Sequence, residues 1–199
     1  MWHWFRKNKK DYPKFWEEYC ASFSAKTNSS ERLVVFDTET TGLDLKNDVI
    51  LSIGAIAIVN SRIILKDSFE CFVEQENYKP NQIAIHGILK EGKTEKNTEI
   101  EAIVSFISYI KNATLIGHHI AFDIAMINGA LKRMGLPKLK NKSIDTDAIY
   151  QKYKNLSPEQ HTTLDALCGN FKIPKSDRHT ASGDAYLTAL VYLKLKAKM

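Results

Sequence analysis

The chain has 199 residues, of which 44% are hydrophobic and 26% charged, and its net charge is +5. This composition is typical of a soluble globular protein, and the length suits one domain with an additional element. No apolar run approaches the roughly 20 residues needed to cross a bilayer, and the N-terminus mixes aromatic with charged residues, unlike a secretory signal. We therefore expect a cytoplasmic protein with no membrane partner.

The three cysteines are odd in number and far apart in the chain: Cys20, Cys71 and Cys168. This spacing favours reduced thiols over a disulfide framework or a CxxC-type metal site. We expect them to be buried small hydrophobic residues.

The first 31 residues differ in composition from the rest, since eight of the twenty aromatic residues lie before residue 24. Five of these recur at helical spacing, namely Tyr12, Phe15, Trp16, Tyr19 and Phe23. They predict an amphipathic helix with Asp11 as N-cap and Pro13 in its first turn. Its aromatic face is expected to dock on the following domain, in preference to a membrane surface or a partner protein.

The polar run at residues 26–31 is read as a linker. We therefore divide the chain into an N-terminal helical extension with its linker, residues 1–31, and a domain of residues 32–199.

Within this domain, strands come first and helices follow. β-Branched runs predict strands at 32–38, 49–59 and 63–73, the last two joined by a turn at Asn60-Ser61. The later pattern predicts helices at 83–89, 98–111 and 120–134, short strands at 113–117 and 142–145, and helices to the end. This order indicates an α/β fold in which a mixed sheet is flanked by helices.

Two carboxylates, Asp37 and Glu39, stand at the end of the first strand, in the stretch VVFDTETTGLD. Because side chains alternate along a strand, residues at i and i+2 share one face of the sheet. Two like charges held together raise one pKa or recruit a cation, and oxygen ligands suit a hard metal such as Mg²⁺ or Mn²⁺. Many such pairs are simply solvated strand ends, so this pair alone does not establish a metal site.

Two further acids lie on the apolar faces of predicted helices. Asp123 shares its face with Ile127 and Ala130, and Asp184 shares its face with Leu187 and Val191. An unpaired charge there is costly, so a metal ion or hydrogen-bond donors must offset it.

His179 lies five residues before Asp184, where it can approach the same centre from solvent. A histidine is suited to taking a proton from water near neutral pH.

Three segments together, FDTETTGL, GHHIAFD and HTASGD, resemble the three motifs of the DEDDh (DnaQ-like) 3′-to-5′ exonuclease family. The resemblance covers residues 32–199. It implies an RNase H-like fold with a mixed five-stranded sheet whose first three strands are antiparallel. It also implies a metal-dependent enzyme that hydrolyses nucleic-acid 3′ ends to nucleoside 5′-monophosphates.

The resemblance also implies a set of site residues. The four metal-binding acids would be Asp37, Glu39, Asp123 and Asp184, holding two Mg²⁺ or Mn²⁺ ions, and the general base would be His179. Substrate contacts would fall on Thr38, Thr40, Thr41, Gly42 and His86.

The motif GHHIAFD has His119 where many relatives carry Asn. We expect this change to be tolerated, because the position is not a metal ligand in the family. The doublet His118-His119 does not predict a zinc site, since no cysteine or third histidine has suitable spacing.

The chain extends fifteen residues beyond Asp184, without the long tail by which replicative members of the family reach a polymerase. The expected partners are single-stranded or frayed nucleic-acid 3′ ends, with a DNA polymerase as a further candidate that would be contacted without such a tail. The oligomeric state is open.

Residues 132–178 hold ten Lys or Arg against five acids. This excess suits a nucleic-acid backbone, although a solvated lysine-rich surface gives the same pattern. We expect a DNA exonuclease of the proofreading or repair type. The alternatives are an RNA-trimming or oligoribonucleotide-degrading exonuclease, and a non-catalytic nucleic-acid-binding scaffold of the same fold.

Overall fold

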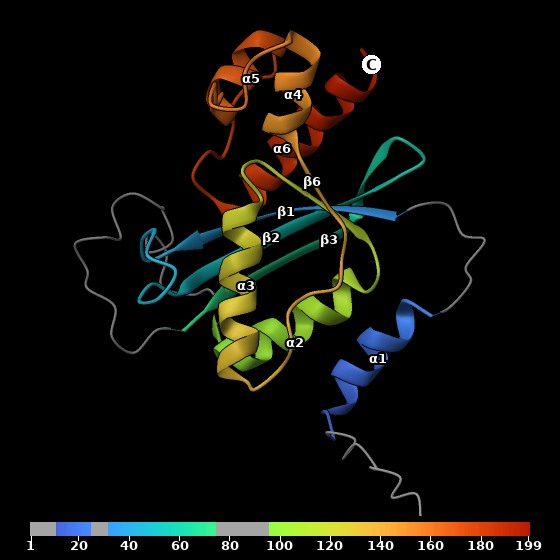
Figure 1. Ribbon diagram of the computed structural model, residues 1–199, viewed down its shortest axis with the longest axis vertical. Coiled ribbons are helices and arrows are strands. Elements are labelled where there is room, and N and C mark those ends of the chain that lie inside the picture. Colours follow the sequence, from blue (N-terminus) through green and yellow to red (C-terminus); the bar gives the residue numbers. More distant parts are fainter. Residues whose placement is uncertain (1–10, 25–31, 75–95) are drawn as a thin grey trace, which may run out of the picture.

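The computed structural model describes residues 11–24, 32–74 and 96–199 (Figure 1). Its strands are β1 (Arg32–Thr40), β2 (Ile50–Val59), β3 (Arg62–Val73), β4 (Lys96–Asn97), β5 (Thr114–Gly117) and β6 (Ser143–Asp145). Its helices are α1 (Lys14–Ser22), α2 (Glu99–Ile110), α3 (Ala121–Arg133), α4 (Thr146–Lys154), α5 (Leu164–Phe171) and α6 (Ala181–Lys196).

The strands form one mixed sheet in the order β4-β3-β2-β1-β5-β6. β1, β2 and β3 are antiparallel, whereas β5 runs parallel to β1 and β6 runs parallel to β5. The predicted mixed sheet of RNase H-like type is confirmed, but the predicted count of five strands is wrong, since the described residues form six. The additional strand, β4, has two residues. A strand of this length is too short to show the alternation of apolar and polar residues by which strands are recognised in a sequence.

The sheet lies between two layers of helices, with α1, α2 and α3 on one side and α4, α5 and α6 on the other (Figure 1). The side chains of β1 alternate between these layers. Val34 and Phe36 belong to the hydrophobic core that includes α2 and α3, and Leu33 and Val35 belong to the core that includes α6. The strand is therefore buried on both faces and ends in the functional motif.

Helix α6 is apolar around most of its circumference because it separates two cores. Ala189 and Tyr192 pack toward the sheet, while Leu187, Val191 and Leu195 pack against α4 and α5. A helix that is buried on nearly all sides has a fixed position. It can hold an acidic side chain accurately against the sheet.

Helix α1 docks on the domain through its aromatic face, as expected. Trp16 and Tyr19 are 1% and 3% exposed and join the core of α2 and α3. The Tyr19 hydroxyl donates to Asn141 Oδ1 at 2.6 Å and accepts from the backbone N–H of Lys140 at 2.7 Å.

The predicted N-cap of this helix is wrong, because the helix begins after Pro13 and not after Asp11. Pro13 is itself the cap residue, with φ −56°, and its carbonyl accepts from Trp16 and Glu17. A proline disfavours the helical conformation for the residue before it, so the chain cannot turn into the helix earlier. The domain division at residue 31 stays a prediction, and residues 26–31 and the predicted helix at 83–89 lie outside the described residues.

None of the helices in the described ranges is long and apolar enough to cross a membrane. All three cysteines are free thiols, with Cys71 and Cys168 buried and Cys20 half-buried. That they are reduced stays a prediction.

Candidate active site

The first two acids of the site lie at the C-terminal end of β1, on the face that α6 covers. Asp37 is paired with Gly54 of β2 and Glu39 with Ser52. The pairing shifts register after Glu39, so the strand becomes irregular directly beyond the two carboxylates. Asp37 and Glu39 share this face of the sheet, as the strand period predicts.

Two glycines allow Asp184 to approach these acids. A Cβ at Gly54 would collide with the backbone of Ala181 and Ser182, so the first turn of α6 can lie on β2 only because this side chain is absent. A Cβ at Gly183 would collide with the carbonyl of Asp177 in the preceding loop. The first turn of α6, which carries Asp184, therefore packs tightly between β2 and this loop.

Carboxylate oxygens of Asp37, Glu39 and Asp184 lie within 4.8 Å of one another. Burial raises the pKa of Asp37 well above its ordinary value, and the charges of Asp123, Asp184 and Glu39 raise it further. Burial and the charge of Asp184 raise the pKa of Glu39 to about 7. Acids that resist ionisation in this way require a cation to become fully charged at neutral pH.

The fourth acid, Asp123, comes from the first turn of α3 on the opposite layer and is 5% exposed. Its Oδ1 accepts from the backbone N–H of Thr38 at 2.9 Å and from the Thr38 hydroxyl at 2.6 Å. Burial raises its pKa to about 7, although the bonds from Thr38 act in the opposite direction. Thr38 therefore holds Asp123 beside the strand end.

His179 and Arg178 lie in the loop between α5 and α6. His179 is exposed, with φ 62°, and its charge acts to lower the pKa of Glu39 against the larger effect of burial. Arg178 Nη1 forms an ion pair with Asp184, and Arg178 Nη2 forms another with Asp165 at 3.1 Å. The loop therefore brings one imidazole and one guanidinium to the carboxylates.

The turn after β1 is fixed by its own hydrogen bonds. The Thr40 hydroxyl donates to the carbonyl of Gly42 at 2.7 Å, and the Thr41 hydroxyl donates to Asp48 at 2.7 Å. Their assignment to substrate binding stays a prediction, as does that of Thr38, whose side chain contacts Asp123. His86 lies outside the described residues.

The donor set fits divalent metal ions of the hard class. Carboxylate oxygens are the ligands that Mg²⁺ and Mn²⁺ prefer. Within the part of the chain that the structure describes, Oδ1 of Asp184 is buried and has no hydrogen-bond partner, so its lone pairs are available to a metal ion. The three acids can hold a metal ion, and Asp123 is near enough for its charge to raise the pKa of Asp37.

Sequence reasoning missed the role of Arg178 and Asp165, since both counted only as members of a charged segment. It also missed Asp147 and His161. Asp147 contacts both His119 and His161, which lie far apart in the chain. No spacing rule connects these residues.

Comparison with known proteins identifies the family. The RNase_T family model, described as Exonuclease, matches residues 34–192, from β1 into α6. The chain belongs to this exonuclease family. The predicted exonuclease family and the predicted 3′-to-5′ exonuclease activity are thereby confirmed. The DEDDh subtype stays a prediction.

Curated relatives of this exonuclease include subunits of a DNA polymerase. The DNA polymerase III subunit epsilon of Buchnera aphidicola (strain Sg) is 36% identical over 184 residues, covering 83% of this chain and 75% of that subunit. The same subunit of Escherichia coli K12 is 33% identical over 174 residues, covering 82% of this chain and 71% of the subunit.

Solved structures share the fold at lower identity. E. coli exonuclease I in complex with a dT13 oligonucleotide matches with a TM-score of 0.71 and 18% identity, over 84% of this exonuclease and 41% of exonuclease I. The chain thus spans about two fifths of exonuclease I. At this identity the match supports the common fold.

Proposed function

We propose that this exonuclease removes nucleotides one at a time from the 3′ end of DNA by the DEDDh mechanism, releasing nucleoside 5′-monophosphates. Asp37, Glu39 and Asp184 would hold one divalent ion, and Asp37, helped by Asp123 through water, a second. Bound together, two such ions supply the positive charge that activates water and stabilises the leaving 3′ oxygen.

The residues of the chain do the positioning and the proton transfer. His179 takes a proton from the attacking water, for which an exposed imidazole beside Glu39 is suited. Thr38 keeps Asp123 in place through two hydrogen bonds to one oxygen. Turn residues Thr40, Thr41 and Gly42 lie next to Glu39, where they would support the terminal nucleotide.

The observation that carries this proposal is the convergence of Asp37, Glu39 and Asp184 within 4.8 Å. Holding three acids together costs free energy in the absence of a cation, because burial and like charges both oppose ionisation. A protein that only binds nucleic acid gains nothing from such a cluster. Catalysis with bound metal explains it.

We propose DNA as the substrate because the curated relatives named above are DNA polymerase subunits. A polymerase is a candidate partner for the same reason. RNA remains the second substrate class to test, since its recognition depends on contacts to the 2′-OH.

The experiment is degradation of single- and double-stranded DNA and RNA, labelled at the 3′ or the 5′ end, with Mg²⁺, Mn²⁺ or EDTA. The proposal expects mononucleotides released from the 3′ end of DNA in the presence of metal only. Faster cleavage of RNA would favour the RNA-trimming alternative. Binding without cleavage in either metal would favour the scaffold.

A further inference from the structure

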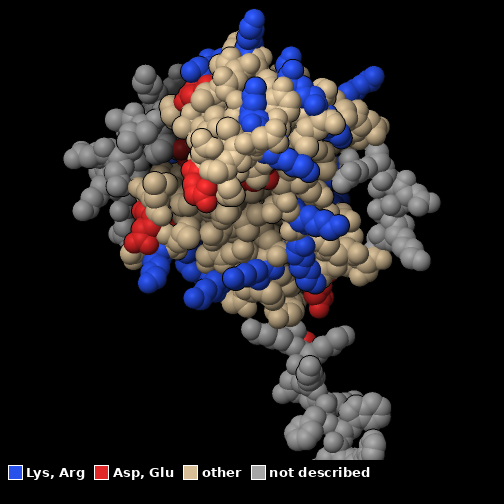
Figure 2. All heavy atoms as spheres, turned by 45° about the horizontal axis from the view of Figure 1, so that its top comes forward, with Lys and Arg blue, Asp and Glu red and all other residues tan. Residues whose placement is uncertain are grey.

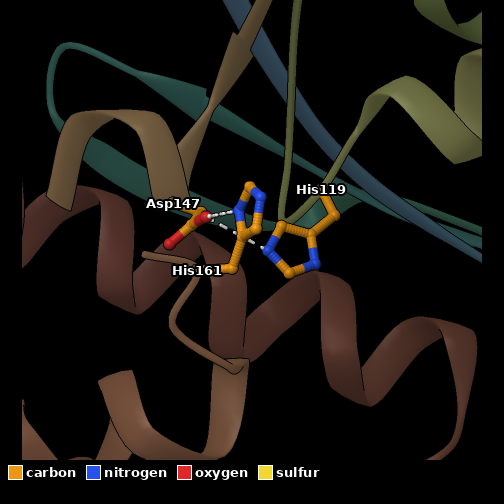
Figure 3. Close-up of side chains that lie close together, drawn as sticks. All are labelled: His119, Asp147 and His161. Atoms are coloured by element: carbon orange, nitrogen blue, oxygen red, sulfur yellow. Dashed lines mark hydrogen bonds and ion pairs between the residues drawn. The ribbon is translucent and has the colours of Figure 1, made fainter. Parts of the chain in front are cut away.

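Three side chains away from the carboxylate cluster converge on one point, and Figure 3 shows His119, Asp147 and His161 directed toward one another. His161 Nδ1 lies 2.8 Å and His119 Nε2 lies 3.2 Å from the same oxygen, Oδ2 of Asp147. The ligand atoms of all three residues lie within 4.8 Å of one another. They come from the loop before α3, the start of α4 and the loop before α5.

We propose that His119, Asp147 and His161 form a second metal site, which takes a transition-metal ion of the Zn²⁺ class. Two imidazole nitrogens and one carboxylate oxygen are a borderline donor set, preferred by Zn²⁺, Co²⁺ and Ni²⁺ over Mg²⁺. The all-carboxylate cluster at Asp37 has the opposite preference. One chain therefore offers two sites of different metal selectivity.

The distances suit such an ion. Zinc bonds of about 2.0 to 2.2 Å in a tetrahedron place ligand atoms about 3.3 Å apart. The two nitrogen–oxygen distances of 2.8 and 3.2 Å need to widen by only a few tenths of an ångström. The side chains of His119 and His161 are 47% and 65% exposed, so water can occupy the remaining coordination position.

The backbone around the three ligands is held in place. Oδ1 of Asp145 accepts from the backbone N–H of His119 at 3.1 Å and from that of Asp147 at 2.9 Å. This one carboxylate fixes two of the ligands relative to each other. It also holds His119 in its left-handed conformation, with φ 56°.

The third ligand is positioned from the other side. Gln151 donates to the carbonyls of Pro158 and Gln160, each at 3.2 Å, and so holds the turn that leads to His161. The backbone N–H of Thr162 donates to Oδ1 of Asp147 at 2.9 Å. Because Oδ1 is taken, Oδ2 is the oxygen that faces the two imidazoles.

His118 supports the site without joining it. Its ring stacks on that of His119, with centroids 4.3 Å apart, and its Nδ1 lies 3.0 Å from the Thr146 hydroxyl. This stacking restricts the rotation of the His119 ring.

The sequence offers no third histidine at a suitable spacing for the doublet, but the fold brings His161 close to His119. His161 lies 42 residues after His119, a spacing that matches no zinc motif. The two imidazoles meet because β6 and α4 bring Asp147 between them.

The test measures Zn²⁺ binding to the full chain in excess Mg²⁺, which fills the carboxylate cluster, by competition with a chromophoric chelator. Wild type is compared with His119→Gln and His161→Gln, and His179→Gln serves as the matched control at an exposed histidine elsewhere. We expect one bound Zn²⁺ in wild type and control. Each ligand variant should bind at least 10- to 100-fold more weakly, which is the cost of losing even an outer-shell partner.

Co²⁺ provides an independent reading, since its visible absorption is much stronger at a four- or five-coordinate protein site than in the octahedral hydrated ion. The band should be present in wild type and His179→Gln and absent in both ligand variants, with folding checked by circular dichroism. Equal Zn²⁺ affinity in wild type and in both ligand variants would overturn the site. Loss of binding in His179→Gln would also overturn it, by moving the ion to the carboxylate cluster. If one variant does not fold, the other decides.

Discussion

The guanidinium of Arg178 forms an ion pair with the carboxylate of Asp184, a proposed metal ligand. A second ion pair, with Asp165, holds the same guanidinium from the other side. Although burial acts in the opposite direction, these two acids raise the pKa of Arg178, so it remains charged. In the metal-free protein Arg178 neutralises part of the charge that a metal ion would neutralise.

Arg178→Met should therefore tighten Mn²⁺ binding, by about tenfold if freeing Asp184 is worth about 1.4 kcal/mol. The same variant should melt at a lower temperature in EDTA, because Asp184 then lacks a counter-charge. Mn²⁺ titration and thermal unfolding measure the two effects. Arg133→Met is the matched control, since Arg133 pairs with Glu99 away from the site. Weaker Mn²⁺ binding in Arg178→Met would contradict the competition.

Asp184→Ala should reduce hydrolysis by about 10³-fold or more, since a bound metal contributes several kcal/mol to the transition state. The fold should survive, because the change removes one of several repelling charges. Single-turnover cleavage and circular dichroism check both parts, and Glu99→Gln is the control for loss of an acid elsewhere. Undiminished turnover in purified Asp184→Ala would remove the metal assignment.

Metal should also stabilise the folded chain. Binding to the native state alone adds about 2.7 kcal/mol when the metal is at 100 times its Kd. The melting temperature should rise from EDTA to Mg²⁺ or Mn²⁺ in wild type, and much less in Asp184→Ala. A melting temperature indifferent to millimolar metal would count against a site that binds without nucleic acid.

The pH dependence of stability follows from Glu39. Its pKa in the folded protein is about 7, above the ordinary value of 4.5, so the folded state binds more protons than the unfolded state between these values. Stability in EDTA therefore falls as the pH rises from about 4.5 to 7. Asp37 and Asp123, whose pKa values are also raised, act in the same direction.

Glu39→Gln should accordingly be more stable than wild type in EDTA at pH 7.5, by about 1 to 3 kcal/mol. Its stability should vary less with pH. Urea unfolding of both proteins at pH 5 and pH 7.5 measures the difference. If the free energy of unfolding of Glu39→Gln equals that of wild type at both pH values, the pKa of Glu39 is not raised in the folded protein.

Two glycines offer a matched pair of substitutions. Gly54→Ala should destabilise the protein by about 1 to 3 kcal/mol and lower activity, because the added Cβ collides with the backbone of Ala181 and Ser182 and displaces Asp184. Gly129→Ala, in the middle of α3, meets only the end of the Arg133 side chain at 3.6 Å. It should stabilise by about 0.5 to 1 kcal/mol and leave activity unchanged. Equal changes in stability and activity in the two variants would contradict the close approach of α6 to β2 at Gly54.

Much of this site follows from short-range periodicity. Asp37 and Glu39 share a face because a strand alternates, and Asp123 and Asp184 are buried because they lie on apolar helix faces. The ion pair of Arg178 and the meeting of His119 with His161 depend on how loops pack after folding, and no local pattern encodes that. The start of α1 shows one local rule overriding another, since Pro13 and not Asp11 sets it.

Charge on the surface gives a further prediction. Lys and Arg cover more of the face drawn in Figure 2 than Asp and Glu do. The exposed Lys138, Lys140 and Lys142 lie before β6. β6 runs parallel to β5, and β5 to β1. The three lysines are therefore nearer the N-terminal end of β1, away from the carboxylates at its C-terminal end.

Changing all three lysines to Glu should weaken binding of a long single strand and flatten its salt dependence by about 0.7 in log-log slope for each lost phosphate contact. Binding of a dinucleotide should not change, because it cannot reach from the carboxylates to these lysines. Single-turnover cleavage of a bound end should survive. An unchanged salt slope would show that the nucleic-acid backbone does not contact these three lysines.

The position of β1 inside the sheet has a consequence for how activity is lost on heating. β1 pairs with β2 on one side and with β5 on the other. Asp37 and Glu39 therefore lie on a strand that separates from its neighbours only when the whole domain unfolds. His179 belongs to a loop between α5 and α6 that lies outside any helix or strand. Local opening of that loop would withdraw the proposed base while the acids stay assembled. Thermal inactivation should then precede global unfolding, and rapid amide exchange in the loop should coincide with it.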